Sequence, residues 1–145
     1  QAQAAARKIG AEAFQVNVLT AAEIEQGFAR MAQERADAVV VLLDGFLLIQ
    51  HEQIAGLAMK YRLPSAFQTV LYDGVGGLMS FGPDTRDNFR RVGALVDKIL
   101  KGAKPGEIPF EQPTRYYFVI NRKSANQLGI KLSNEVLSRA DRIIE

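Results

Sequence analysis

Residues 37–44 read Asp-Ala-Val-Val-Val-Leu-Leu-Asp, and this stretch decides the fold class. A continuous apolar run rich in β-branched residues is typical of a central parallel strand covered on both faces. Residues 47–61 follow with apolar side chains at helical spacing. Before the run, Thr20 and Glu23 have the spacing of a capping box at the start of another helix. A strand between two helices predicts a parallel sheet of the α/β class.

The rest of the chain continues this alternation of strand-like and helical segments. Their order predicts an α/β fold, namely a doubly wound, mostly parallel sheet with helices on both faces. Residues 103–113 contain three prolines, a spacing that favours an extended connector. The other expected strands are 14–19, 65–68, 78–81 and 114–120, and the other expected helices are 2–9, 84–101, a short one between Asn121 and Gly129, and a last one that follows Ser133 and turns Ile143 and Ile144 inward.

Composition excludes several function classes. The chain has 145 residues, enough for one domain, and a formal net charge of +2 with basic and acidic residues interspersed, so we expect no nucleic-acid partner. It contains no Cys, so it can form neither a disulfide nor a thiolate metal site. His51 is the single histidine and has no metal-ligand spacing around it. We therefore expect no metal, no cofactor and no catalytic residues.

Ligands of open parallel sheets bind beyond the carboxyl ends of the strands, and this rule selects four loops. They follow the expected strands 37–43, 65–68, 78–81 and 114–120, the last at Asn121. From these loops we predict ligand-binding roles for Asp44, Gly45, Phe46, Gln68, Thr69, Gly82 and Asp84.

Each of these residue types has a second, purely structural interpretation. The Asp44 carboxylate can accept hydrogen bonds from an ammonium or hydroxyl group of a ligand, but Asp-Gly is also a common turn pair. Phe46 can stack on a ligand or pack in the core. Gln68 can bind a carboxylate or an amide, or simply end a strand. Asp84 is expected to cap a helix first and to contact a ligand second.

Three other classes of protein share parts of this pattern. A receiver-type signalling domain shares the length and the Asp at a strand end, but the chain lacks an acidic pair near its start and Lys123 is poorly placed. The effector-binding domain of a transcription regulator shares the fold and stays open. A dinucleotide enzyme is disfavoured, because residues 74–77 are rich in glycine but form no phosphate-binding fingerprint.

The sequence resembles a known family along its whole length. The stretches 62–67 (RLPSAF), 76–83 (GGLMSFGP), 96–114 (VDKILKGAKPGEIPFEQPT), 118–130 (FVINRKSANQLGI) and 137–145 (LSRADRIIE) are similar to the C-terminal half of ABC-transporter substrate-binding proteins related to tryptophan- and tyrosine-binding receptors. Residues 1–60 resemble the family more loosely. Where these relatives often have Asp-Asn-Thr after the hydrophobic strand, this chain has Asp44-Gly45-Phe46, so only the Asp carries over.

The resemblance implies one lobe of a type I periplasmic binding protein. Residues 1–145 would form the second, C-terminal ligand-binding lobe, and a crossover segment at about 84–113 would pack on the first lobe. The implied function is the solute-binding component of an ABC importer for a small molecule such as an amino acid or aromatic compound. The implied partner is the ABC permease, and the implied location is periplasmic or extracytoplasmic with a lipid anchor. Dimerisation or domain swapping of this chain stays open.

Overall fold

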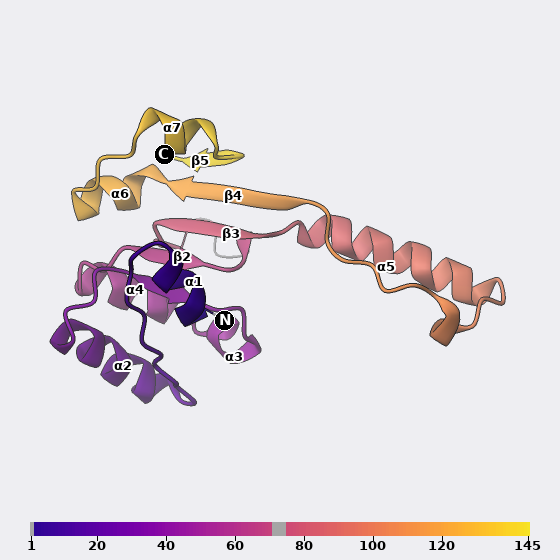
Figure 1. Cartoon of the computed structure of the whole chain (residues 1–145), viewed down its shortest axis with the longest axis horizontal. Coiled ribbons are helices and arrows are strands. Elements are labelled where there is room, and N and C mark those ends of the chain that lie inside the picture. The colour runs from indigo at the N-terminus through magenta and orange to yellow at the C-terminus, as the bar shows by residue number, and fades with distance from the viewer. Residues whose placement is uncertain (1, 71–74) are drawn as a thin grey trace. The chain divides into compact units, whose positions relative to one another are not determined.

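The computed structural model describes residues 2–70 and 75–145, which divide into two compact units at residues 35 and 36. The first unit contains helix α1 (Ala2–Lys8), an extended segment and helix α2 (Ala21–Gln33) (Figure 1). Thr20 caps α2 by accepting a hydrogen bond from the Glu23 backbone N–H at 3.3 Å, and the Glu23 carboxylate accepts one from the Leu19 N–H at 2.7 Å. The predicted start of this helix is confirmed.

The prediction of a strand at residues 14–19 is wrong, because these residues form an extended segment outside the sheet. Val16 and Val18 are half-buried between exposed neighbours, so the alternation is real. A Cβ added at Gly27 of α2 would lie 2.9 Å from Val16, which shows how closely this segment follows the helix. Within the described residues the segment has no hydrogen-bonded neighbour strand, and a sheet ladder requires one.

The second unit contains a five-stranded sheet in the order β1-β2-β3-β4-β5. Neighbouring strands are parallel except β3 and β4, which are antiparallel with Gly82 opposite Tyr117. The mostly parallel α/β architecture is therefore confirmed. The strands are β1 (Val39–Val41), β2 (Ser65–Phe67), β3 (Met79–Pro83), β4 (Tyr116–Asn121) and β5 (Arg142–Ile144), and the helices are α3 (Gly45–Ile49), α4 (His51–Lys60), α5 (Thr85–Leu100), the 3-10 helix η2 (Pro105–Glu107), α6 (Arg122–Leu128) and α7 (Asn134–Ser138).

The strand that suggested the fold lies at one end of the described sheet, not at its centre. Val41 is buried, but the side chain of Val40 on the opposite face is 64% exposed. The expectation that both faces are covered is thus wrong for β1. The apolar run specified a strand correctly, but it could not specify which neighbours would cover it.

Both faces of the sheet contribute to the core. Phe67, Ser80 and Val119 share one face by register, and all three are buried. The opposite face contains the fully buried Ile120, but it is open towards the end of β3, where Phe81 and Tyr116 are 57% and 48% exposed. Helix α4 contributes the buried residues Ile54, Ala55, Leu57 and Ala58.

The last predicted helix is wrong in its second half. Helix α7 ends at Ser138, and residues 142–144 form strand β5 parallel to β4. Asp141 makes two hydrogen bonds of 2.8 Å with Phe118, one from its backbone N–H to the Phe118 carbonyl and one from the Phe118 N–H to its carboxylate. These bonds dock the chain end along β4, and its β-branched residues suit a strand.

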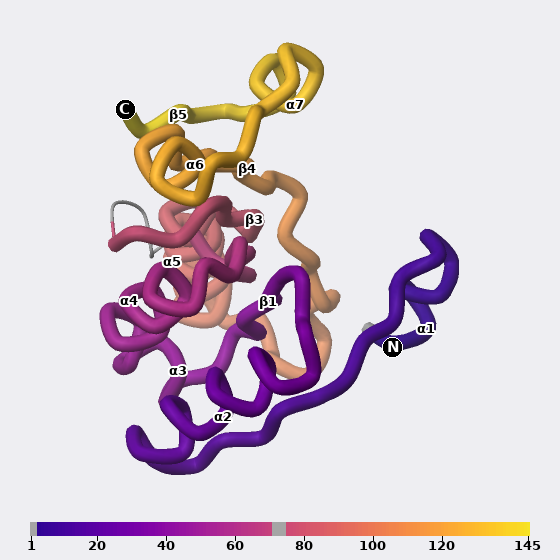
Figure 2. The backbone as a smooth tube through the Cα atoms, turned by 90° about the vertical axis from the view of Figure 1, so that its left-hand side faces the viewer, coloured from indigo at the N-terminus to yellow at the C-terminus, as the bar shows by residue number. Residues whose placement is uncertain are grey.

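Helix α5 and the returning residues 101–115, which together we call the arm, project from the sheet (Figure 1). In Figure 2 the arm points away from the viewer. Asp84 caps α5 as predicted, and Gly102, with φ +99°, follows its end. No residue of α5, all of which is described, is buried.

Candidate functional site

The carboxyl ends of β1 and β2 meet at one edge of the sheet and are tied together there. The Gln68 backbone N–H donates to the Val41 carbonyl at 3.1 Å, and the Leu43 N–H donates to Gln68 Oε1 at 3.3 Å. The second bond assigns the oxygen of the Gln68 amide to the protein. Gln68 is exposed, and its amide N–H groups have no acceptor among the described residues, so they are available to a ligand.

Gly82 brings the end of β3 to the same place. A Cβ at Gly82 would lie 2.8 Å from the Gln68 carbonyl oxygen and 2.8 Å from Thr69 Cα. Both atoms belong to the backbone, so a side chain at position 82 would force the 68–69 backbone to move. Thr69 is buried at this contact, whereas Gln68 remains exposed. The close approach explains why glycine stands here.

Asp44 acts as the N-cap of α3. Its Oδ1 accepts hydrogen bonds from the Phe46 N–H at 2.8 Å and the Leu47 N–H at 3.2 Å. The structural interpretation of Asp44 is thereby established. The side chain is exposed, and within residues 2–70 and 75–145 its second oxygen has no partner, so a ligand donor could bind the same carboxylate.

Asp84 caps α5 in the same manner. Its Oδ1 accepts from the Arg86 N–H at 3.0 Å and the Asp87 N–H at 3.2 Å. Its Oδ2 lies 4.0 Å from Arg115 Nε, and its own backbone N–H donates to the Arg115 carbonyl at 2.9 Å. Asp84 therefore joins the two connections between sheet and arm.

Not every predicted residue reaches this edge in the expected role. Gly45 begins α3, and a Cβ on it would meet no atom within 4 Å, so it has no special steric role. Phe46 is half-buried within α3. Asn121 lies at the opposite edge, because β4 runs antiparallel to β3 and the Asn121 N–H donates to the Leu78 carbonyl where β3 begins. It is buried and caps α6 through Ser124.

The reversal of β4 also places residues at the candidate edge that the sequence did not reveal. Arg115 precedes β4 and lies beside Asp84. Phe81 and Tyr116 stack with ring centroids 5.6 Å apart and an interplanar angle of 11°. The sequence rule selected Asn121, at the end of β4, but Arg115 and Tyr116 lie at its start. Only the direction of β4 relative to β3 decides which end of the strand reaches the candidate edge.

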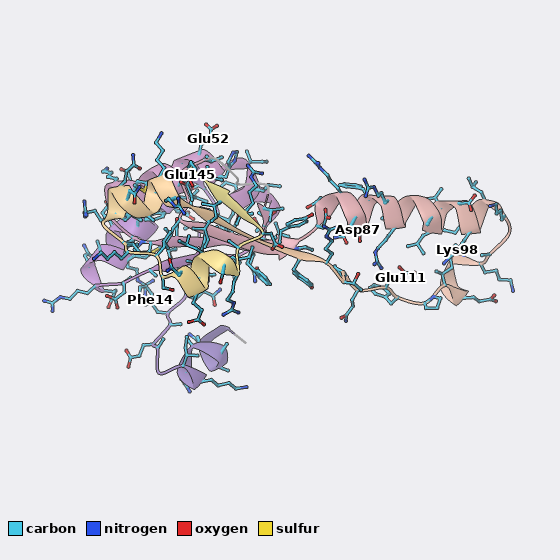
Figure 3. All side chains as sticks on the ribbon, turned by 90° about the horizontal axis from the view of Figure 1, so that it is seen from above. Phe14, Glu52, Asp87, Lys98, Glu111 and Glu145 are labelled. Carbon is cyan, nitrogen blue, oxygen red and sulfur yellow. The ribbon has the colours of Figure 1, made fainter. Side chains whose placement is uncertain are left out.

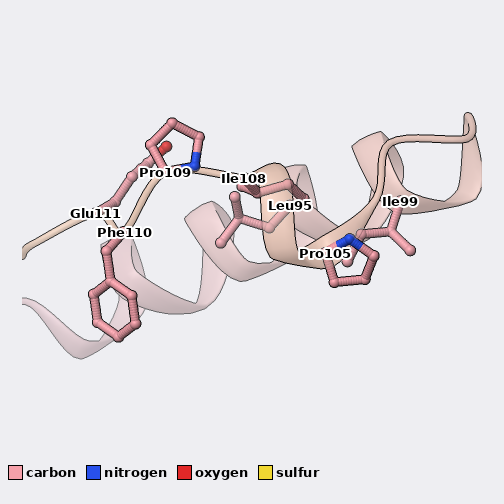
Figure 4. A pocket seen from close by; sticks show the side chains of 7 residues that line it. All are labelled: Leu95, Ile99, Pro105, Ile108, Pro109, Phe110 and Glu111. Atoms are coloured by element: carbon pink, nitrogen blue, oxygen red, sulfur yellow. The ribbon is translucent and has the colours of Figure 1, made fainter.

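A cavity among the described residues lies elsewhere. An apolar groove of about 280 Å³ runs between α5 and the returning segment (Figure 4), away from the edge with Asp44 and Gln68. We give the edge more weight as a ligand site, because polar groups from separate loops converge there. The groove is lined by Leu95, Ile99, Pro105, Ile108, Pro109, Phe110 and Glu111.

Of the glycine-rich stretch 69–77, residues 71–74 lie outside the described residues.

Two negative findings apply to the described part of the chain. It contains no group of three or more His, Cys, Asp or Glu side chains that could hold a metal ion. None of its helices is both long and apolar enough to span a membrane.

Three solved structures are similar to this chain. A conserved domain protein from Vibrio cholerae O1 biovar El Tor is 26% identical with a TM-score of 0.89, over 97% of this chain and 47% of that one. An ABC domain from Streptococcus pneumoniae in complex with L-Trp is 28% identical with a TM-score of 0.88, over 98% and 49%. A ligand-free, open substrate-binding protein with adhesive properties from Clostridium difficile, at 17% identity, has a TM-score of 0.69 over 99% and 48% and supports the fold alone.

The chain thus spans about half the length of these structures. No curated protein matches it. The family described as ABC transporter substrate binding protein matches residues 1–144, nearly the entire chain. The sheet with its converging loop ends, the similar structures and this match agree, and the chain belongs to the ABC transporter substrate-binding protein family.

Proposed function

We propose that the chain is a ligand-binding lobe of the solute-binding component of an ABC importer. The observation that carries the proposal is the convergence of the loops at Asp44 and Gln68 with Gly82, near the end of β3, at one edge of the sheet of a chain in this family. Residues 1–145 would be the second of two lobes. Binding without turnover would favour a closed state only through the difference in affinity between closed and open states.

An amino acid or a small aromatic compound is the ligand class we favour. The free Asp44 oxygen can accept from an ammonium group, and the Gln68 amide can donate to a carboxylate or carbonyl oxygen. Phe46, together with the exposed rings of Phe81 and Tyr116, supplies apolar surface near this edge. The L-Trp complex of the Streptococcus pneumoniae structure supports this class by similarity.

The arm would serve the two-lobed architecture. Residues 84–113 leave the sheet and return to it, and α5 exposes Phe89, Val92 and Val96 by 72%, 52% and 48%. We propose that this apolar face packs on the first lobe. The partners would then be the solute and the ABC permease, in a periplasmic or lipid-anchored extracytoplasmic location.

The test is a thermal-shift screen of the full protein that carries this chain, against amino acids and small aromatic carboxylates. A ligand that binds only the folded state raises the melting temperature as its concentration exceeds Kd. One solute class should give a dose-dependent shift. A flat response across amino acids and aromatic carboxylates would contradict the proposed ligand class.

Asp44→Asn separates the two roles of Asp44. Asn preserves the helix cap but removes the charge, so the melting temperature without ligand should stay nearly unchanged. Affinity for an ammonium-bearing ligand should fall by about 10- to 100-fold, because a hydrogen bond to a charged group is lost. Isothermal titration calorimetry measures this effect. The matched control is Asp37→Asn, an exposed carboxylate that precedes β1 at the other edge; equal losses in both variants would refute a binding role for Asp44.

A further inference from the structure

The base of the arm contains a cluster of polar contacts centred on Arg91 of α5. Its Nε donates to Asp87 Oδ2 at 3.0 Å, its Nη2 to Thr114 Oγ1 at 2.6 Å, and its Nη1 lies 3.4 Å from Glu111 Oε2. All three nitrogens of one guanidinium are thus engaged. Figure 3 labels Asp87 on α5 and Glu111 on the returning segment.

The arm has two limbs, helix α5 and the returning segment 101–115. Two of the three partners of Arg91 belong to the returning segment. Asp87 is one turn before Arg91 on the same helix, and it holds the guanidinium in place. Glu111 and Thr114 are 20 and 23 residues further along the chain. Arg91 therefore makes side-chain bonds across the arm where the returning segment approaches the sheet.

Few other polar interactions hold the returning segment at the base of the arm, next to the sheet. Of residues 101–115, only Ile108 and Pro113 are half-buried and the others are exposed. The other contacts at the base are the Asp84 N–H bond to the Arg115 carbonyl and the Asp84–Arg115 ion pair at 4.0 Å. A proline-containing segment of this length would otherwise behave as a semi-rigid linker with its own freedom of motion.

We propose that Arg91 is a three-point clamp that makes α5 and the returning segment move as one rigid body. The planar fork of arginine suits this role, because its donors reach acceptors in several directions at fixed angles. The Asp87 hydrogen bond, followed by the charges of Asp87 and Glu111, raises the pKa of the Arg91 guanidinium against the opposing effect of desolvation. Arginine is charged at neutral pH in any case, so the clamp carries a full positive charge.

The clamp is a property of this chain and holds whether or not a solute binds. The consequence is mechanical. If the limbs were independent, a rotation of one could be absorbed by the other. With the limbs joined at Arg91, any displacement of the arm is transmitted to both connections with the sheet, at Asp84 and at Arg115.

Paired spin labels test the clamp directly. The sequence contains no Cys, so labels attach only at introduced sites, and exposed Ala94 on α5 and exposed Gln112 on the returning segment suit Ala94→Cys and Gln112→Cys. Double electron–electron resonance then gives the distance distribution between the limbs. We expect one narrow distribution, which Arg91→Ala broadens by about twofold or more because the segment regains linker freedom.

Two matched variants decide whether the effect belongs to the clamp. Arg90→Ala removes a neighbouring exposed arginine and should leave the distribution narrow. Arg91→Lys keeps the charge but offers a single ammonium in place of a fork, so it should broaden the distribution to an intermediate extent. Far-UV circular dichroism should show the same helix content in all variants, because alanine and lysine favour helices.

Three outcomes would overturn the proposal: a distribution that is broad before any substitution, one that stays narrow in Arg91→Ala, or equal broadening in Arg90→Ala. None of these outcomes depends on ligand binding. Failure of the clamp and failure of the solute-binding proposal can therefore be told apart.

Discussion

Gly82 is the residue at which strand β3 comes closest to the 68–69 loop of the candidate site. Gly82→Ala would place a methyl group 2.8 Å from backbone atoms of both Gln68 and Thr69. Such overpacking should cost about 1–3 kcal/mol of unfolding free energy, and it should also displace Gln68. Urea denaturation followed by circular dichroism measures the loss.

The control for this prediction is Gly93→Ala on α5. A Cβ at Gly93 meets no atom within 4 Å, so the change should stabilise the helix by about 0.5–1 kcal/mol. Equal effects of the two substitutions would mean that Gly82 has no steric role. The sequence selected Gly82 only through its position after a strand. The reason for glycine at that position is visible only in the approach of the 68–69 loop.

At the scale of elements, helix ends followed their sequence signals closely. Caps at Thr20, Asp84, Asn121 and Ser133 all accept backbone hydrogen bonds in the first turn. These are local interactions within four residues, so sequence spacing is enough to predict them. The pairing of strands far apart in the sequence was harder to predict. Residues 14–19 were predicted as a strand but have no partner strand among the described residues, and residues 142–144 were predicted as helix but pair with β4.

In the described ranges, two helices are followed by a left-handed residue that is not glycine. Arg35 after α2 and Arg62 after α4 both have φ of +55°. Arg35→Gly should stabilise the chain by about 0.5–1 kcal/mol, because relief of the left-handed strain exceeds the added flexibility of the unfolded chain. Thermal unfolding monitored by circular dichroism checks the gain.

Arg35→Ala is the matched control, since it removes the same side chain but keeps the Cβ that causes the strain. It should give no gain. Arg62→Gly should gain less than Arg35→Gly, because Arg62 also donates from Nη2 to the Leu128 carbonyl at 3.3 Å. If alanine and glycine at position 35 stabilised equally, backbone strain would not be the cause.

At the scale of the whole molecule, the arm is the least covered part of the second unit. Its helix exposes Phe89, Val92, Val96 and Leu100 along one stripe, and Leu100 is 82% exposed. Apolar stripes of this kind mark surfaces that bind another surface. The 145-residue chain alone is therefore expected to self-associate, and its mass by light scattering should rise with concentration.

The double variant Val92→Lys with Val96→Lys should shift the chain towards the monomer mass, because two charges would have to be buried in the contact. Ala94→Lys adds a charge on the opposite side of α5 and should leave self-association intact. A monomer mass for the unmodified chain at every concentration would contradict the prediction. In the two-lobed protein proposed above, the same stripe would instead pack on the first lobe.

The sequence by itself determined the α/β class, the apolar strand at 39–41 and the helix caps, among them Asp44 and Asp84. Each of these features follows from hydrophobic periodicity or from hydrogen bonds between near neighbours in the chain. Only the tertiary structure decided the direction of β4, the exposure of Val40 and the pairing of β5 with β4. These depend on contacts between residues far apart in sequence, and a strand has the same local pattern whichever way its neighbour runs.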